Sequence, residues 1–498
     1  MSEGNVEPTT HPTTSTGKRP SYLRRMLGES AVYGLGGVAN QALGIILVPI
    51  YARQLGVTDY GTVAILSTTL SLTTMIATLA MPQAFFRSYL KEADTESERA
   101  AVLRTTIGLR LIVSILALLL ISGFAYPLAV VLLGTGAEWH LMALIGAIVF
   151  FDSLNVVPFS FLRAERRPFP YVRLAFIRAV LGSALIIVFV VVFDLGVVGV
   201  LLGSLASAIV TASVALLTLA REHRLGLGFD RPLVRHMLAF ALPLVPASIA
   251  GWTLNLSDRY IVQAFDGRTA VGLYSSGYTV GLAINALAIA PFGLAWGATY
   301  WEIARQPDAR ETIARTLTAF VTLAAFAALG LSAMSTDLFR FFLTPEFEAG
   351  RFVTPFSAFG YVFYGVYTVV TTGLNLESQT RRVPLILGGV AIANVAINLA
   401  LVPFIGYLGA AISTLVSYAM LAVIGGVVSQ RYYAVQWQLG RPTALITLAL
   451  ALSAAALLGP DHVAWRAACV IAYPGIGLGL RLIPIRTLTT LVSIVRRR

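Results

Sequence analysis

The sequence predicts an all-α, polytopic membrane protein with fourteen transmembrane helices, in two groups of six followed by a C-terminal pair. Composition is the first reason: 57% of the 498 residues are hydrophobic and only 12% are charged, far from the averages of soluble proteins. Apolar runs long enough to cross about 30 Å of hydrocarbon recur along the whole chain, which is the second reason. An internal repeat is the third, because it divides the helices into two similar sets.

The repeat relates residues 26–61 to residues 237–272. Both copies close with the motif G-x-T-x-x-G, which reads GVTDYG at 56–61 and GRTAVG at 267–272. A second pair of segments has nearly the same spacing: FDLGVVG around Gly196 and Gly199, and PFIGYLG around Gly406 and Gly409. Since an even number of helices separates the copies, both are expected to run in the same direction across the membrane. The identical residues include Met26/Met237, Leu27/Leu238, Ala39/Ala250, Leu43/Leu254, Ile50/Ile261, Gly56/Gly267, Thr58/Thr269 and Gly61/Gly272.

Four units follow from this layout: a basic tail (1–25), two six-helix bundles (26–225 and 226–440) and a terminal unit of two helices and a basic tail (441–498). The first unit is expected to be disordered and cytoplasmic, because residues 1–17 are rich in Ser, Thr and Pro and have no apolar core. The last two helices carry little polarity and are expected beside the second bundle. The predicted spans are about 30–52, 60–83, 106–126, 139–161, 172–193, 197–220, 238–262, 270–298, 314–334, 353–375, 384–402, 407–429, 443–459 and 463–483.

Basic residues predict the orientation of the chain. If the N-terminus is cytoplasmic, 30 of the 36 Lys and Arg residues lie in or beside segments on the inner side. Cytoplasmic loops of membrane proteins carry an excess of Lys and Arg, so this distribution favours fourteen spans with both termini cytoplasmic. The net charge of +12 is then a signal of topology and gives no reason to expect nucleic acid as a partner. The exceptions are Arg53, Arg259, Arg268, Arg340, Arg351 and Arg466.

Several classes of function are disfavoured by the sequence. Every predicted loop is too short to hold a soluble catalytic domain, and the P-loop motif G-x-x-x-x-G-K-[ST] is absent. The single Cys469 provides no disulfide framework or cysteine-based metal site, and the five His residues have no metal-ligand spacing. The prediction is a protein that is not an enzyme and has no cofactor, with H⁺ and Na⁺ left open as coupling ions.

Polar residues within the spans are the candidate functional residues, because each is costly in hydrocarbon unless it faces protein or water. In the first span Asn40 and Gln41 are adjacent, and Arg53 lies at the outer end. Arg53 has an alternative role as an anchor at the membrane interface. In the fourth span Asp152 and Asn155 are three residues apart and share a helix face, where a water-filled cavity would account for them.

The seventh span is the repeat counterpart of the first and holds Asn255, Asp258 and Arg259 within five residues. A neutralised structural pair is the alternative reading of Asp258 and Arg259, but their position favours a functional role. Elsewhere, hydrogen bonding between helices is the expected role of Asn285, Asn394 and Asn398.

The exit of the first span, ARQLGVTDYG at 52–61, and the run SDRYIVQAF…VGLYSSGY at 257–278 carry a family resemblance. With the 6+6+2 layout, they resemble the polysaccharide-transporter branch of the multidrug/oligosaccharidyl-lipid/polysaccharide exporter superfamily, over roughly residues 25–490. That branch contains bacterial O-antigen and capsule-precursor flippases, and the lipid II flippase is a relative. The resemblance implies two six-helix bundles in a V around a central, cationic, water-filled cavity that opens alternately to cytoplasm and periplasm.

The resemblance also implies which residues meet the substrate. Cavity arginines of the family engage the pyrophosphate of an undecaprenyl-linked oligosaccharide, and Arg53 and the Asp258–Arg259 pair are the matching positions here. The lipid II branch has a cluster of charges in its first helix, whereas Asn40 and Gln41 are uncharged, which disfavours a peptidoglycan precursor. The expected substrate-binding residues are Arg53, Arg259, Asn40, Gln41 and Asn255, and the expected ion-coupling residues are Asp258 and Asp152.

The expected function is flipping of an undecaprenyl-pyrophosphate-linked oligosaccharide (an O-antigen, capsule or exopolysaccharide unit) across the bacterial inner membrane. A polar cavity would replace the hydration of the sugar headgroup while the lipid tail stays in the bilayer. The lipid-linked oligosaccharide and the bilayer are the expected partners, and polysaccharide polymerase machinery is a candidate third. The alternative is an ion-coupled multidrug antiporter of the same superfamily, for which twelve spans and acidic cavity residues would be typical.

Arg259 is the residue on which the substrate prediction depends most. Its neighbour Asp258 points about 100° away around a regular helix, so the two side chains are not expected to satisfy each other. Arg259 would then be free to bind a phosphate, whose geometry suits the planar guanidinium. Asp258 would need a partner of its own, such as a proton or Na⁺.

Overall fold

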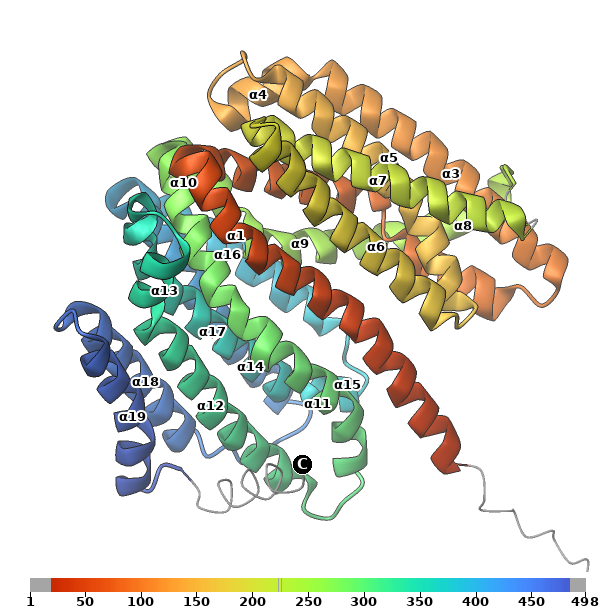
Figure 1. The fold of residues 1–498 in the computed structure, drawn as a ribbon. Helices are drawn as coiled ribbons and strands as arrows, with labels where there is room; N and C mark the ends of the chain where they lie inside the picture. The colour runs from red at the N-terminus through yellow and green to blue at the C-terminus, as the bar shows by residue number, and fades with distance from the viewer. Residues whose placement is uncertain (1–18, 223, 225, 484–498) are drawn as a thin grey trace, which may run out of the picture.

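The computed structural model describes residues 19–222, 224 and 226–483, with side chains from residue 47 onward, and every regular element in these residues is a helix. The helices form two bundles and a peripheral pair, which are red to olive, green to light blue and dark blue in Figure 1. The predicted all-α fold class is confirmed. In chain order the elements are α1 (Arg19–Thr78), α2 (Met81–Arg87), η1 (Ser88–Glu92), α3 (Glu96–Gly123), α4 (Ala125–Leu133), α5 (Trp139–Ala164), α6 (Pro168–Ile187), η2 (Val188–Val192), α7 (Gly196–Arg221), α8 (Arg231–Ala241), η3 (Leu242–Leu244), α9 (Val245–Leu256), α10 (Asp258–Ile284), η4 (Asn285–Ile289), α11 (Ala290–Ile303), α12 (Ala309–Ala333), α13 (Ser335–Phe342), η5 (Pro345–Val353), α14 (Thr354–Val370), α15 (Thr372–Leu376), α16 (Arg382–Ile405), α17 (Tyr407–Gln430), α18 (Gly440–Leu458) and α19 (Val463–Gly479).

Eleven helical stretches of the described chain are long and apolar enough to cross a membrane. Two of them each contain two predicted spans: Leu47–Glu92 holds the end of the first span and the second, and Arg231–Ile303 holds the seventh and eighth. The fourteenth span corresponds to a shorter apolar helix, Val463–Gly479. Each predicted span therefore coincides with a helix, and the chain is a multi-pass membrane protein.

The internal repeat is visible in the backbone. Gly56 interrupts α1 with φ 69° and ψ 174°, and Gly267 interrupts α10 with φ 81° and ψ 178°. Glycine alone adopts these angles without strain, so each closing G-x-T-x-x-G motif forms a sharp break between two transmembrane helices. The second glycine pair also matches, since Gly196 and Gly406 have φ values of 51° and 59° at the starts of α7 and α17.

The two copies meet beside these breaks, at the end of the bundles that is predicted to face outward and is called the outer end below. A Cβ atom on Gly61 would clash with the carbonyl oxygen of Arg268, and one on Gly272 would clash with that of Val57. Val57 and Arg268 occupy equivalent positions in the repeat, so the same contact is made twice around a pseudo-two-fold axis. Glycine at both sites allows α1 and α10 to cross with their backbones in contact, as Figure 1 shows near the top of the molecule.

Arg268 adds polar contacts between the bundles at the outer end. Its Nε donates to the carbonyl oxygen of Leu133 at 3.0 Å, and its Nη1 donates to Glu138 Oε1 at 2.9 Å and to Thr62 Oγ1 at 3.4 Å. Leu133 is the last residue of α4, and Glu138 immediately precedes α5, so both flank the turn between these helices of the first bundle. Arg268 and Glu138 therefore form a latch across the two bundles, and the outer end is closed.

The crossing from the first bundle to the second runs through α8 and α9. Asp230 caps α8 by accepting a hydrogen bond from the Leu233 amide at 3.1 Å, and the buried face of α8 packs against α2 and α3 of the first bundle. α9 instead packs against α16 of the second bundle. Although α8 lies within the predicted second unit, 226–440, its contacts are with the first, so the chain changes bundle after Ala241.

The C-terminal pair, α18 and α19, packs against α12 on the side of the second bundle. An ion network at the outer end holds it there. Arg466 in α19 is buried and donates through Nε to Asp337 Oδ2 at 2.8 Å and through Nη1 to Asp461 Oδ1 at 2.8 Å. Arg340 in α13 pairs with Asp461 as well, at 2.8 Å.

Candidate functional site

Asp258 and Arg259 lie at a local break in the seventh span. α9 ends at Leu256, Ser257 forms a turn, and α10 begins at Asp258. Both charged side chains are almost fully buried, with exposed fractions of 3% for Asp258 and 8% for Arg259. Charges at this depth require partners, and the surrounding helices supply them.

Both oxygens of the Asp258 carboxylate are hydrogen-bonded. Oδ1 accepts from Arg259 Nη1 at 3.3 Å. Oδ2 accepts from the hydroxyl of Tyr274, which follows the break at Gly267 and lies on the second helix of α10, and from Thr414 Oγ1 of α17 at 3.4 Å. Asp258 thereby connects α10 to α17 as well as to its neighbour.

The contact between Asp258 and Arg259 contradicts the expectation that their side chains would not satisfy each other. The 100° separation applies to a regular helix, whereas these residues follow directly on the turn at Ser257. The arginine side chain is also long enough to fold back along the helix, where its Nη1 donates to the carbonyl oxygen of Asn255 at 3.2 Å. The need of Asp258 for a separate ionic partner therefore does not follow from the helix geometry.

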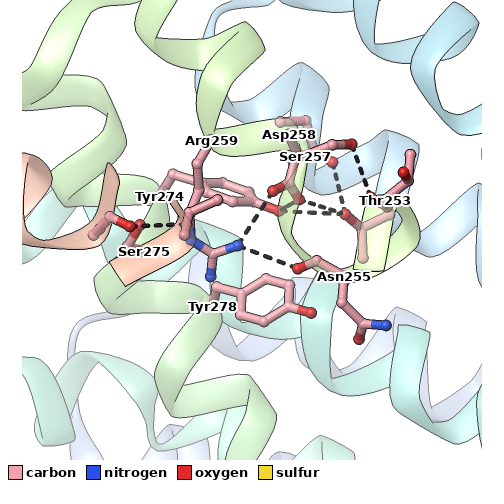
Figure 2. Close-up of polar contacts among 12 residues, drawn as sticks. Thr253, Asn255, Ser257, Asp258, Arg259, Tyr274, Ser275 and Tyr278 are labelled. Carbon is pink, nitrogen blue, oxygen red and sulfur yellow. Dashed lines mark hydrogen bonds and ion pairs between the residues drawn. The ribbon is translucent and has the colours of Figure 1, made fainter. Parts of the chain in front are cut away.

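Arg259 lies among aromatic rings (Figure 2). Its guanidinium carbon is 4.8 Å from the ring centroid of Tyr278 and 5.7 Å from that of Tyr274. These cation–π contacts stabilise the cation without using its N–H donors. Its hydrogen bonds to described residues all involve Nη1, so Nε and Nη2 have no acceptor among those residues.

Asn255 belongs to the same network, and its side chain is hydrogen-bonded to other residues of the protein. Its Oδ1 accepts from the Tyr418 hydroxyl at 2.6 Å and from the Tyr361 hydroxyl at 3.4 Å, and its Nδ2 donates to the Gly251 carbonyl at 2.7 Å. The Tyr361 and Tyr278 hydroxyls are 2.9 Å apart. The predicted binding residue Asn255 is therefore committed to positioning this tyrosine cluster.

Arg259 lines a cavity of about 330 Å³ between α1 and α10. Three pairs of its lining residues are equivalent in the repeat: Val48 with Arg259, Ala64 with Ser275, and Thr68 with Thr279. The cavity therefore lies on the pseudo-two-fold axis between the bundles. In each pair the residue of the second copy is at least as polar, and Arg259 is the only charged residue among the lining residues that the structure describes.

The other predicted binding residues are placed elsewhere or not described. Arg53 is exposed near the outer end of the first span, just before the break at Gly56 in α1, and does not line the cavity. Asn40 and Gln41 belong to α1, but their side chains lie outside the described residues. The structure thus brings together Asn255, Asp258 and Arg259, and it leaves Arg53 apart from them.

Asp152 lies in the first bundle, away from this network. It is paired with Arg178 of α6, whose Nη2 is 2.7 Å from Asp152 Oδ1. Asp152 and Asn155 line one groove, as their spacing predicts. Arg178 was assigned to an inner flank by its charge, but it lies in the middle of α6.

Arg110 is a second arginine that the charge pattern misplaced. It lies in the middle of α3 and is 1% exposed. Nη2 donates to the carbonyl oxygen of Ser153 at 3.1 Å, and Nη1 donates to that of Ala77, near the end of α1. The predicted span 106–126 begins only four residues before Arg110, so the sequence carries no clear signal that this side chain lies inside the bundle.

Comparison with known proteins agrees with this architecture. A family model described as "Polysaccharide biosynthesis protein" matches residues 27–296 of 498, more than half of the chain. No curated protein matches the sequence.

Solved structures of similar fold include "Lipid II flippase MurJ, inward closed conformation", with 13% identity and a TM-score of 0.71, covering 90% of this chain and 98% of that one. They also include an inward-facing multidrug resistance MATE family transporter of the MOP superfamily, with 16% identity and a TM-score of 0.64, covering 78% and 94%. The identities are low enough that these likenesses speak for the fold alone. The resemblance noted in the sequence is confirmed, and the chain belongs to the polysaccharide biosynthesis protein family.

Proposed function

We propose that this protein flips an undecaprenyl-pyrophosphate-linked oligosaccharide across the bacterial inner membrane by alternating access. The observation that carries the proposal is the placement of Arg259 in a membrane-embedded cavity on the axis between the two bundles. Its unused N–H donors, Nε and Nη2, suit the two oxygens of a phosphate. Family membership and a fold shared with a lipid II flippase support the same reading.

An anionic ligand suits this cavity better than a cationic drug does. Arg259 is the single charged residue among the described residues that line the cavity, and the carboxylate of Asp258 accepts hydrogen bonds from three side chains. A multidrug antiporter would be expected to present an acidic group to its cations. The O-antigen, capsule or exopolysaccharide nature of the glycan follows from the family and is part of the proposal.

Ion coupling is proposed to act through Asp258 or Asp152, the two buried carboxylates that are paired with arginine inside the bundles. In proteoliposomes, flipping by the wild type should then depend on a proton or Na⁺ gradient. Asp258→Asn or Asp152→Asn should make the rate independent of that gradient. A rate that keeps its gradient dependence in both variants would remove these residues from coupling.

The test of the main proposal is complementation of a deletion strain, with surface polysaccharide and membrane-bound lipid-linked glycan both measured. Arg259→Ala leaves Asp258 buried without its counter-charge, which costs roughly 3–5 kcal/mol and threatens folding. The double variant Asp258→Asn/Arg259→Gln removes both charges and avoids that cost. It should insert normally, lose export and accumulate the lipid-linked glycan, while Arg259→Lys should restore export in part.

Arg315→Ala is the matched control, because Arg315 is exposed on α12 and its ion pair among the described residues is with Glu311 alone. This variant should export as well as the wild type. Normal export by a well-expressed double variant would disprove the proposal.

A further inference from the structure

A polar groove separates α5 from α6 in the first bundle, with a volume of about 500 Å³. That volume lies within the range of small-molecule sites, roughly 300–1,000 Å³. None of its described lining residues also lines the cavity that contains Arg259. The groove is lined by Asp152, Asn155, Ser160, Arg163, Tyr171 and Arg178, among others.

Each helix lines the groove with one face at helical spacing, and that face mixes polar residues with Val156, Phe159 and Ala175. On α5, residues 152, 155, 156, 159, 160 and 163 fall on one side, and on α6 residues 171, 175 and 178 do the same. Apolar side chains in place of Asp152, Asn155 and Arg178 would allow α5 to close against α6. Polar groups within a bilayer are costly, so a set of them around an open volume indicates a binding site.

Asn155 supplies the sharpest observation. It is 1% exposed, and its Nδ2 donates to the carbonyl oxygens of Phe151 at 3.2 Å and Ala208 at 3.4 Å. Its Oδ1 is buried and accepts no hydrogen bond from any described residue. A buried acceptor without a donor costs about 1–3 kcal/mol, and a ligand hydroxyl in the groove would remove that cost.

The neighbouring groups extend the same chemistry. Asp152 offers carboxylate oxygens, and Arg178 pairs with it at 2.7 Å while its side chain remains 40% exposed. Arg163 is exposed at the rim and lies over the ring of Phe86, 5.2 Å from its centroid. Carboxylate, carboxamide and guanidinium groups are planar and can each engage two adjacent hydroxyls of one ligand.

The groove also has an aromatic wall. Phe159 of α5 and Tyr171 of α6 pack edge to face with their ring centroids 5.2 Å apart. Aromatic surface beside planar polar groups suits a sugar ring, which has apolar C–H faces and a rim of hydroxyls. An anionic lipid headgroup would favour clustered cations alone, whereas here a carboxylate and a carboxamide share the site.

We propose that the groove between α5 and α6 binds a sugar residue of the transported glycan, with Asn155 Oδ1 accepting a hydroxyl hydrogen bond. The proposal rests on the proposed function only in naming a glycan headgroup as the source of the sugar. The pyrophosphate would bind Arg259 and the sugar would bind this groove. The first bundle would then bind the glycan, and the second bundle would bind the phosphate.

Saturation-transfer-difference NMR on the purified protein in nanodiscs tests the groove directly. The probes are free hexoses, N-acetylhexosamines, 6-deoxyhexoses and hexuronic acids at millimolar concentration. At least one should give ring-proton signals with the wild type, and Asn155→Leu should weaken its affinity about tenfold. Ser160→Ala provides a milder second variant, expected to weaken the same sugar severalfold.

Asn398→Leu is the matched control, because Asn398 is a fully buried asparagine of the second bundle whose Oδ1 also lacks a described partner. It should keep the sugar signal, and so should Asp258→Asn/Arg259→Gln. Absence of binding by every sugar, equal loss in Asn398→Leu, or binding of glycerol phosphate in place of sugars would each overturn the proposal. Because this readout needs no flipping, sugar binding can persist when the export test fails, and the two results are distinguishable.

Discussion

The side-chain oxygens of Thr58 and Thr269 lie 2.9 Å apart, at equivalent positions of the two repeats. A residue that contacts its own counterpart lies on the axis relating the two copies, as in an isologous interface. The axis therefore passes between these hydroxyls at the outer end. Gly61 and Gly272 flank the contact, so α1 and α10 form one symmetric joint between the bundles.

The joint predicts the effect of adding a methyl group to it. In Gly61→Ala or Gly272→Ala the new Cβ meets an opposing backbone carbonyl, which cannot rotate away. Overpacking of this kind costs about 1–3 kcal/mol, so the outer end should open and the melting temperature should fall. Labelling of Ser67→Cys in the cavity by a membrane-impermeant maleimide, in a Cys469→Ser background, should increase.

Gly293→Ala provides the control for that experiment. Gly293 lies in α11, where an added Cβ meets nothing within 4 Å. Alanine is the better helix former, so this variant should be neutral or slightly stabilising. Unchanged labelling in the Gly61 and Gly272 variants would contradict the tight joint.

The ion pair between Arg268 and Glu138 predicts that its loss shifts the equilibrium between the closed and open outer end. Their side chains are 20% and 32% exposed, and such a pair contributes about 1 kcal/mol, or roughly a fivefold change in population. Arg268→Gln should therefore raise labelling of Ser67→Cys from the outside several-fold. The reversed pair, Arg268→Glu with Glu138→Arg, should restore much of the closure, and failure to do so would mean that the Leu133 and Thr62 contacts dominate.

The ion pairs of the buried Arg466 are expected to contribute most of the free energy that holds the C-terminal helix pair against the second bundle. Its side chain is 4% exposed, and its removal leaves Asp337, 25% exposed, without that partner. Arg466→Ala should destabilise the fold by about 3 kcal/mol, near the lower end for a broken buried pair because Asp337 keeps some contact with water. Thermal unfolding and hydrogen exchange in 463–479 measure the effect, and Arg315→Ala should show almost none of it.

The Asp461 carboxyl, which pairs with Arg466, predicts that the stability of the protein depends on pH. Hydrogen bonds from Arg466, and then from Arg340, hold its pKa below the ordinary value of 3.8. The unfolded chain therefore takes up the proton first, and the stability contributed by Asp461 is fully present above about pH 4 and is lost as the pH falls further. The melting-temperature difference between wild type and Asp461→Asn should be constant from pH 7 to 5 and shrink towards pH 3.

Much of the fold was predictable because hydrocarbon imposes a simple rule on sequence. Long apolar runs become helices, and the glycines of G-x-T-x-x-G become breaks, as Gly56 and Gly267 show. The pairing of Asp152 and Asn155 on one groove also followed from helical spacing. These features depend on local periodicity, which is read directly from the order of residues.

The partners of the charged residues depend on contacts between distant segments, and there the sequence was insufficient. Asp258 accepts hydrogen bonds from Tyr274 and Thr414, and no feature of the sequence of the seventh span predicts either partner. Arg110 and Arg178 were counted with the inner flanks, because an alternating pattern of loops says little about depth within a helix. Arg53 matched a family position but lies exposed, since a motif fixes the backbone and leaves the direction of a long side chain open.

Among the described residues that line the cavity, the equivalence of Val48 and Arg259 across the axis leaves a charge on the wall of the second bundle only. A ligand phosphate bound there would travel with the second bundle throughout the transport cycle, while the first bundle swings past it. Two opposed arginines would both bind the anion in one state and would be separated in the other. The motion of the bundles would then by itself change the affinity for the anion. With a single tether, release must instead come from water or a competing ion that reaches Arg259 once the opposite wall has withdrawn.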